Sequence, residues 1–260
     1  MVSTKNKVIL SILTLMTAMN LSACSADSVH QGRPIVVAHR GGAALGMENS
    51  LSCIKAGIAT GADMVEVDVH QTADGQLVVC HDATVDRTTN GQGRIERMTL
   101  VEVRALRLLQ PDGSPSNETL PTLEEVLRLT KGRCGLLLEI KKKKHQYEGI
   151  EQKVAEMLVQ YDMVDEVTVQ SFNKPVLAEI HRLLPTVRVE MLSFLPPARP
   201  NRYNHIASFN VYHHFVNRRF VERAHKASKE VKVWTVDRHS RALRLPVDGV
   251  ITNDPREFLQ

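Results

Sequence analysis

Four side chains that can bind a metal ion or transfer a proton lie close together in the segment VEVDVHQTADGQLVVCHD, residues 65–82. They are Glu66, Asp68, His81 and Asp82. The segment has strand-like runs on both sides of Asp74-Gly75, VEVDVH before it and LVVC after it, which is typical of a β-hairpin with a two-residue type I′ turn. Such a turn pairs Asp68 with His81, and Glu66 projects from the same face as Asp68. The hairpin is therefore predicted to gather two carboxylates and an imidazole on one surface.

A third carboxylate, Glu139, lies near the end of the buried run 135–140. Together, Glu66, Asp68 and Glu139 provide the oxygen ligands that suit a hard divalent cation, Ca²⁺ or Mg²⁺. Zinc is disfavoured, because no thiolate or paired histidine accompanies the three acids. Without a cation they would be ordinary strand-end acids or salt-bridge partners.

Two histidines and two positively charged side chains complete the set of candidate residues. His39 and Arg40 follow the apolar run 35–38, and Lys141 follows Glu139 by two residues. Histidine titrates near neutral pH, so that one ring, at His39 or His81, can accept a proton while the other donates one. Arg40 and Lys141 are suited to holding an anionic phosphate. A cation, two imidazoles and two fixed positive charges predict phosphoryl transfer on a phosphodiester.

Strand-like and helix-like segments alternate along the chain. Strands are predicted at residues 35–38, 64–69, 77–80, 135–140, 167–171, 187–192, 208–212, 231–236 and 249–252. Helices are predicted at 50–60, 123–130, 150–161, 174–184 and 216–228. This alternation indicates a parallel sheet, and at this length an eight-stranded β/α barrel is the leading architecture. In such a barrel the polar residues at the carboxyl ends of the strands converge on one face.

Nine strands are one too many for this barrel. The run 77–80 follows 64–69 after too few residues for a parallel crossover, so it returns antiparallel as the second arm of the hairpin. The predicted fold is thus a (β/α)8 TIM-type barrel, with an extra β-hairpin arm after the second strand. No low-complexity linker divides residues 34–260, which we read as one domain.

The composition is that of a globular protein: 43% of the 260 residues are apolar and 24% are charged. Its 33 basic and 29 acidic residues are nearly balanced. Nucleic-acid binding usually requires a concentrated basic face, so this class of partner is not expected. The expected partner is a small-molecule substrate.

The N-terminus has the layout of a secretory signal, with Lys5 and Lys7 before an apolar stretch too short to span a bilayer comfortably. The sequence LSAC at 21–24 resembles a bacterial lipobox, which predicts a signal peptide at 1–23, lipidation of Cys24 and a linker to residue 33. An ordinary cleaved signal peptide is the alternative. A lipidated protein would be membrane-tethered in the cell envelope, with Ser25 favouring the periplasmic side of the outer membrane if the organism has one.

Three further cysteines, Cys53, Cys80 and Cys134, match no zinc-binding spacing. We interpret them as isolated buried thiols, and at most one disulfide could form among them.

The chain resembles the glycerophosphodiester phosphodiesterase family from Arg33 onward, in the family's own motif order. The matching motifs are HRGG at 39–42, ENS at 48–50, EVDV at 66–69, TADG at 72–75, VVCHD at 78–82, RTTNG at 87–91, LPTLEE at 120–125, LEIK at 138–141, QSF at 170–172, WTVD at 234–237 and GVITNDP at 249–255. Several motifs with correct spacing are far more specific than any single one.

This resemblance implies a β/α barrel that hydrolyses glycerophosphodiesters to glycerol 3-phosphate and an alcohol with a divalent cation. By position it implies His39 and His81 as acid and base, Glu66, Asp68 and Glu139 as metal ligands, and Arg40 and Lys141 as phosphate contacts. The resemblance leaves two residues open. Glu48 either contacts the cation or orients its neighbours, and Trp234 either packs against the substrate or is a wall residue.

Two alternative functions are also compatible with the sequence. The membrane tether favours a related barrel that acts on lysophospholipids or phosphoinositides. A lipoprotein that binds phosphorylated ligands without catalysis is the other, although the full set of acids and histidines counts against it. The sequence does not decide the alcohol, the cation, the nucleophile, the order of the two histidines or the oligomeric state.

Overall fold

The computed structural model describes residues 32–143, 146–236 and 238–259. The strands in this part are β1 (Ile35–Ala38), β2 (Met64–Gln71), β3 (Leu77–Val79), β4 (Gly135–Ile140), β5 (Val167–Ser171), β6 (Arg188–Ser193), β7 (Ser208–Tyr212), β8 (Glu230–Trp234) and β9 (Gly249–Thr252). The helices are α1 (Leu51–Ala59), α2 (Leu100–Ala105), α3 (Leu123–Thr130), α4 (Ile150–Gln160), α5 (Lys174–Leu183) and α6 (Arg218–Lys226). All of them belong to one compact unit, Arg33–Gln260.

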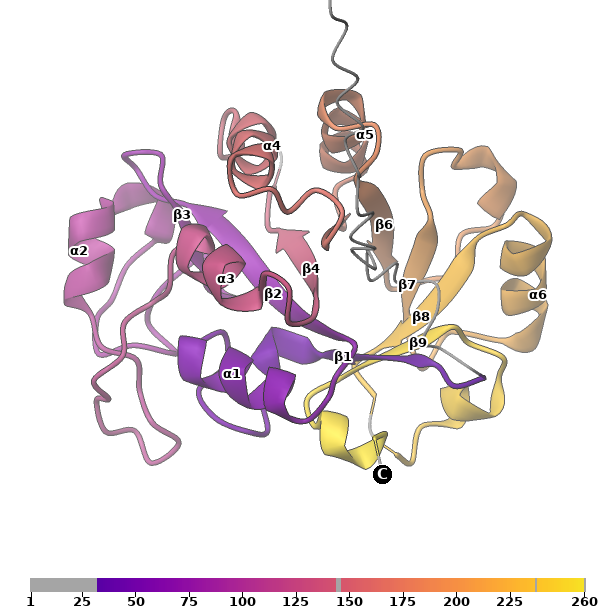
Figure 1. Cartoon of the computed structure of the whole chain (residues 1–260), viewed down its shortest axis with the longest axis horizontal. Helices are drawn as coiled ribbons and strands as arrows, with labels where there is room; N and C mark the ends of the chain where they lie inside the picture. Colours follow the sequence, from indigo (N-terminus) through magenta and orange to yellow (C-terminus); the bar gives the residue numbers. More distant parts are fainter. Residues whose placement is uncertain (1–31, 144–145, 237, 260) are drawn as a thin grey trace, which may run out of the picture. The chain divides into compact units, whose positions relative to one another are not determined.

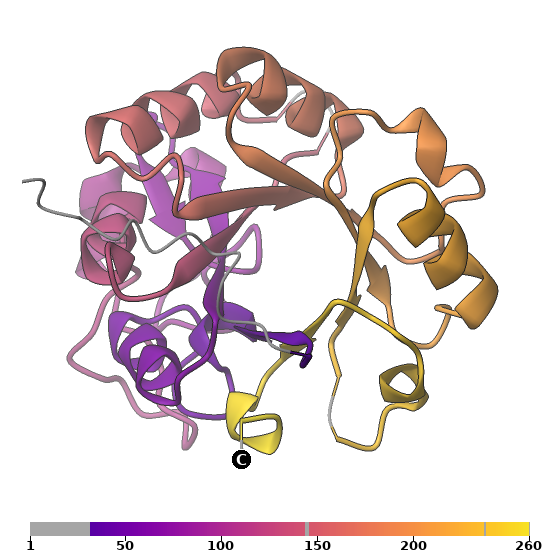
Figure 2. The same cartoon turned by 45° about the vertical axis from the view of Figure 1, so that its right-hand side comes forward.

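Eight parallel strands close into a barrel. Their order is β1-β9-β8-β7-β6-β5-β4-β2, and pairing of β1 with β2 completes the ring. The helices lie outside the strands, as Figures 1 and 2 show. β3 pairs antiparallel with β2 and takes no part in the ring. The predicted eight-stranded barrel with a hairpin arm is therefore confirmed.

The register of the β2–β3 hairpin differs from the prediction by one residue. Val69 pairs with Val79, and the next N–H, that of Cys80, donates to the carbonyl oxygen of Asp68 at 2.9 Å. Asp68 therefore lies opposite Cys80, and the predicted pairing of Asp68 with His81 is wrong. His81 comes one residue later, beyond the end of β3.

The loop of the hairpin explains the difference. Thr72 N–H donates to Gln76 O at 2.9 Å, and Thr72 Oγ1 accepts from Gln76 N–H at 2.9 Å. These bonds leave three loop residues instead of two, with Gly75 at a φ of 82°. A three-residue loop that ends in a left-handed glycine is a common alternative to the type I′ turn.

Side chains alternate strictly across the barrel wall. Val65, Val67 and Val69 of β2 belong to the large apolar cluster between strands and helices. Successive side chains of a strand point to opposite faces, so Glu66 and Asp68 point into the barrel. β2 therefore turns Glu66 and Asp68 inward and its valines toward the helices.

Side-chain caps begin several of the helices. Ser50 Oγ accepts from Cys53 N–H at 3.0 Å at the start of α1, and Thr122 forms a capping box with Glu125 at the start of α3. α2 was not predicted, although Thr99 and Glu102 form a capping box there and the motif TLVE is typical of such a helix start. Within the described residues, no helix combines the length and apolar character needed to cross a membrane.

Candidate active site

The chain makes a tight turn directly after β1. Arg40, Gly41 and Gly42 all have left-handed backbones, with φ of 54°, 82° and 95°. A Cβ at Gly41 would lie 2.9 Å from the Ile54 backbone nitrogen of α1, so only glycine fits there. The non-glycine φ at Arg40 is the kind of strain that functional sites hold. The turn directs the Arg40 N–H at Glu66 Oε2, 2.8 Å away.

The three predicted carboxylates lie together inside the barrel. Glu66, Asp68 and Glu139 each offer an oxygen, and these oxygens are all within 4.8 Å of one another. The parallel register that pairs Asp68 with Glu139 brings β2 and β4 into this arrangement. All three side chains are buried, with residue exposures of 1%, 0% and 6%. Converging buried carboxylates are the donor set of a hard divalent cation, so these residues fit Ca²⁺ or Mg²⁺.

Burial and mutual repulsion govern the charge of this group. Burial, Asp68 and Glu139 together raise the pKa of Glu66 well above its ordinary value. Burial also raises the pKa of Glu139, to about 7, although Lys141 opposes this. Burial acts in the same direction on Asp68, but Lys141, His81 and Arg40 outweigh it and lower the pKa of Asp68. Asp68 is therefore the fixed negative charge of the group.

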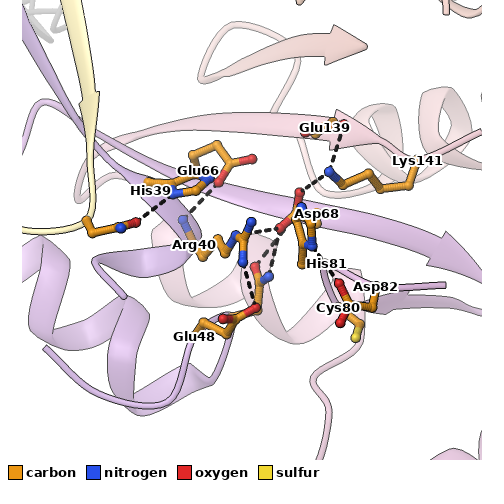
Figure 3. A network of polar contacts seen from close by, with 12 residues as sticks. His39, Arg40, Glu48, Glu66, Asp68, Cys80, His81, Asp82, Glu139 and Lys141 are labelled. Carbon is orange, nitrogen blue, oxygen red and sulfur yellow. Dashed lines mark hydrogen bonds and ion pairs between the residues drawn. The ribbon is translucent and has the colours of Figure 1, made fainter. Parts of the chain in front are cut away.

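Positive and polar groups surround Asp68 (Figure 3). Lys141 Nζ lies 3.0 Å from Asp68 Oδ1 and 2.9 Å from Glu139 Oε1. Asn49 Nδ2 donates to Asp68 Oδ2 at 2.8 Å, and Arg40 Nε lies 3.8 Å from the same oxygen. Arg40 and Lys141 thus border the carboxylates, as their proposed contact with an anionic phosphate requires.

The two predicted histidines approach the carboxylates from different strands, β1 and the return arm of the hairpin. His39 Nδ1 lies 2.7 Å from Asn253 Oδ1, an acceptor, so Nδ1 carries the proton and Nε2 keeps its lone pair. Burial and the neighbouring Arg40 lower the pKa of His39 to about 4. His39 is therefore neutral at pH 7.

His81 has a carboxylate partner instead. Its Nδ1 lies 2.7 Å from Asp82 Oδ1, which accepts only, so Nδ1 is again the protonated nitrogen. Burial lowers the pKa of His81, while Asp68 and Asp82 oppose that shift. Burial raises the pKa of Asp82, but Arg87 and His81 outweigh it and lower the pKa to about 2. The imidazole therefore keeps an anionic neighbour over the whole physiological range.

Glu48 contacts arginines and is not part of the carboxylate group. Its Oε1 accepts from Arg40 at 3.0 Å and from Arg87 at 2.7 Å, and its Oε2 accepts from Arg87 at 2.9 Å. Arg87 Nε in turn donates to Asp82 Oδ2 at 2.6 Å. The geometry supports the interpretation in which Glu48 orients its neighbours. Arg87 was missed as a site residue, although it opens the RTTNG motif.

An aromatic cluster borders the carboxyl ends of β5 to β8. The Trp234 ring contacts those of Phe172, Phe194 and Tyr212 at centroid distances of 5.6, 5.2 and 5.3 Å, and its Nε1 donates to Asn210 O at 2.7 Å. Phe172 and Phe194 are 43% and 58% exposed. The sequence analysis assigned a possible substrate contact to Trp234 alone, although Phe172 closes the QSF motif.

The remaining predictions concern cysteines. Cys53, Cys80 and Cys134 are free thiols in the described part of the chain. The first two are buried as expected, whereas Cys134 is only partly buried, which differs from the prediction. Cys24 and the signal segment lie outside the described residues, so lipidation stays a prediction.

Comparison with known proteins identifies the family. Residues 39–257 match the model of the glycerophosphoryl diester phosphodiesterase family. A glycerophosphodiester phosphodiesterase from Caldanaerobacter subterraneus subsp. tengcongensis is 33% identical over 235 residues, covering 87% of this chain and 97% of that protein.

Two solved structures extend the comparison. A glycerophosphodiester phosphodiesterase from Agrobacterium tumefaciens is similar with a TM-score of 0.75 and 26% identity, over 88% of this chain and all of that one. An Oleispira antarctica phosphodiesterase, solved with the product sn-glycerol-3-phosphate, has a TM-score of 0.76 and 27% identity, over 86% of this chain and 95% of that one. The chain therefore belongs to the glycerophosphoryl diester phosphodiesterase family and is an enzyme of that class.

Proposed function

We propose that the protein hydrolyses glycerophosphodiesters to glycerol 3-phosphate and an alcohol, with a divalent cation and two histidines. The observation that carries this proposal is the group of three buried carboxylates whose oxygens lie within 4.8 Å of one another, bordered by His39 and His81. The product found with the Oleispira relative supports the substrate class. The named relatives favour glycerophosphodiesters over lysophospholipids or phosphoinositides, and the complete set of acids and histidines favours an enzyme over a binding protein.

Glu66, Asp68 and Glu139 would hold the cation, Ca²⁺ or Mg²⁺. When bound, it would withdraw electron density from the phosphate oxygens. Arg40 and Lys141 bind further phosphate oxygens, because both are cationic side chains that lie beside the carboxylates. Trp234 offers an apolar wall to the carbon atoms of the substrate.

His39 accepts the proton of the attacking group, since it is neutral at pH 7 and Asn253 leaves its Nε2 as the basic nitrogen. This role is the same whether water or the substrate's own glycerol hydroxyl attacks. The attacking oxygen bonds to phosphorus, and the bond from phosphorus to the leaving oxygen breaks. If the glycerol hydroxyl attacks, the product is a cyclic phosphate, which water must then open to give glycerol 3-phosphate. Burial, Lys141 and Arg40 lower the pKa of His81, but Asp68 and Asp82 oppose them and favour its charged form, so His81 is the better donor of the two to that oxygen.

The test measures release of glycerol 3-phosphate from glycerophosphocholine. We expect a chelator to abolish activity, added Ca²⁺ or Mg²⁺ to restore it, and His81→Ala to lower kcat by about 100-fold or more. The exposed His214, changed to Ala, is the matched control and should retain activity. Activity that survives both the chelator and His81→Ala would refute the mechanism, and a preference for lysophosphatidylcholine would refute the substrate.

A further inference from the structure

A series of hydrogen-bonded, buried polar side chains lies in the barrel interior and ends at Glu66; we call it the polar chain. Gln170, Glu190, Asn210 and Lys232 come from β5, β6, β7 and β8, and each is at most 2% exposed. Lys232 Nζ donates to Glu190 Oε1 at 2.5 Å. Asn210 Nδ2 donates to Glu190 Oε2 at 2.9 Å and to Gln170 Oε1 at 2.8 Å. Gln170 Nε2 then donates to Glu66 Oε1 at 3.3 Å.

The charge of Glu190 sets the direction of this chain. A carboxylate only accepts hydrogen bonds, so Asn210 must turn its NH₂ group toward Glu190. Ser208 Oγ donates to Asn210 Oδ1 at 3.1 Å, which is consistent with that orientation. The same NH₂ group bonds Gln170 through the glutamine oxygen, so the NH₂ of Gln170 has to face Glu66. Each amide has one donating end and one accepting end, and the orientation passes along the chain.

The barrel is built to keep this carboxylate charged. Burial raises the pKa of Glu190, but Lys232 and Arg188 outweigh it and lower the pKa overall. Lys232 has little space, because a Cβ at Gly249 would lie 2.9 Å from its Cγ. Glycine at this position of β9 leaves room for the lysine stem to cross the interior. The ion pair therefore depends on residues from three strands.

At Glu66 the orientation of Gln170 matters for geometry. Glu66 accepts from the Gln170 amide on one oxygen and from the Arg40 N–H on the other, so each carboxylate oxygen has a donor that fixes its direction. If Gln170 were reversed, its carbonyl oxygen would face Glu66 Oε1 and the hydrogen bond would be lost.

We propose that Glu190, Asn210 and Lys232 are positioning residues. They orient Gln170, which in turn fixes the orientation of the Glu66 carboxylate for binding a cation. This inference rests on the proposed cation site. A purely structural ion pair is the rival explanation. The two explanations can be separated, because replacing both partners of a buried ion pair with uncharged residues of similar volume is often neutral for stability.

The test titrates Ca²⁺ or Mg²⁺ into the cation-free protein by calorimetry and measures unfolding by urea. We expect the double variant Glu190→Gln/Lys232→Met to stay folded while its Kd for the cation rises about 10- to 100-fold. The matched control is Lys142→Met/Glu151→Gln, which removes another ion pair, with a spacing of 2.8 Å, and should leave the Kd nearly unchanged. Asn210→Leu interrupts the series of hydrogen bonds but keeps the Glu190–Lys232 pair. It replaces the double variant in this test if the double variant unfolds.

A second arm repeats these changes in a Gln170→Leu background. If the chain acts through Gln170, the Glu190/Lys232 changes should have no further effect on the Kd there. Unchanged Kd values in the first arm, or full additivity in the second, would overturn the inference. The proposed function fails separately, if the parent protein neither binds the cation nor releases glycerol 3-phosphate.

Discussion

His70 shares the inward face of β2 with the metal-binding candidates but has a supporting position. It is 3% exposed, its Nδ1 lies 2.7 Å from Tyr147 Oη, and its Nε2 lies 3.2 Å from the carbonyl oxygen of His81. Burial lowers the pKa of His70 from 6.5 to about 4. It therefore supports the backbone of His81 as a neutral ring.

This residue makes stability depend on pH. The unfolded chain protonates His70 near pH 6.5 and the folded protein only near pH 4, so the unfolding free energy falls as pH drops between these values. We expect His70→Gln to flatten this fall, by up to about 1.4 kcal/mol per pH unit. Urea denaturation at pH 7, 6 and 5 measures it.

The comparison of slopes isolates His70 from other groups. Glu66 and Glu139 have raised pKa values and act in the opposite direction, but parent and variant share them. The exposed His214, changed to Gln, controls for loss of a histidine as such. Equal slopes in the parent and His70→Gln would contradict the expectation.

At the scale of elements, the hairpin loop depends on a glycine. Gly75 has a φ of 82°, and Lys153 Nζ donates to Gly75 O at 2.9 Å. An added Cβ would lie 2.2 Å from that Nζ. Gly75→Ala therefore combines backbone strain of about 1 kcal/mol with displacement of the lysine.

Gly113 provides the matched control, because it has a φ of 83° but a Cβ added there would have nothing within 4 Å. Urea denaturation should show a loss of about 1 kcal/mol for Gly113→Ala from strain alone, and a larger loss for Gly75→Ala. If the loss of stability for Gly75→Ala were no larger than that for Gly113→Ala, the contact of Lys153 with Gly75 would contribute nothing to the stability of the loop.

Strand positions were largely predictable from sequence, and register was not. β1, β4, β5, β7 and β9 have the predicted bounds, because short apolar runs end at clear polar or turn residues. The predicted hairpin register was wrong. The Asp74-Gly75 doublet favours a two-residue loop, but the hydrogen bonds of the Thr72 side chain stabilise a three-residue loop. Such side-chain competition with a turn has no periodic signature.

The residues of the candidate site also fall into a predictable and an unpredictable group. Residues in the motifs, such as Glu66 and Glu139, were predictable because their chemistry and their strand-end positions coincide. Glu190 and Lys232 were not, because single charges within apolar strands look like solvent-facing positions. Only the closed barrel shows that both side chains point inward and meet.

At the scale of the whole molecule, the N-terminal segment predicts a tether. The lipobox-like LSAC ends at Cys24, close to the start of the compact unit at Arg33. We propose that lipidation of Cys24 holds the barrel at a membrane of the cell envelope, on the periplasmic side of the outer membrane if the organism has one. If Cys24 is lipidated, the nine residue steps from Cys24 to Arg33 could span at most about 32 Å.

Cell fractionation tests the tether. The parent protein should sediment with membranes, and Cys24→Ala should shift the processed protein to the soluble fraction, since the acyl chains supply the anchor. Cys53→Ala, which removes a buried thiol in the barrel, is the control and should stay with the membranes. Soluble parent protein would favour the ordinary cleaved signal instead.

The bond between His39 and Asn253 joins residues 214 positions apart. It depends on the pairing of β1 with β9, the first and last strands of the barrel along the chain. Long-range contacts of this kind form slowly, because the chain must first close a very large loop. During refolding, we therefore expect His39 to gain its partner only when β9 pairs with β1. We expect recovery of enzymatic turnover to report this late step of folding, and far-ultraviolet circular dichroism to report earlier ones.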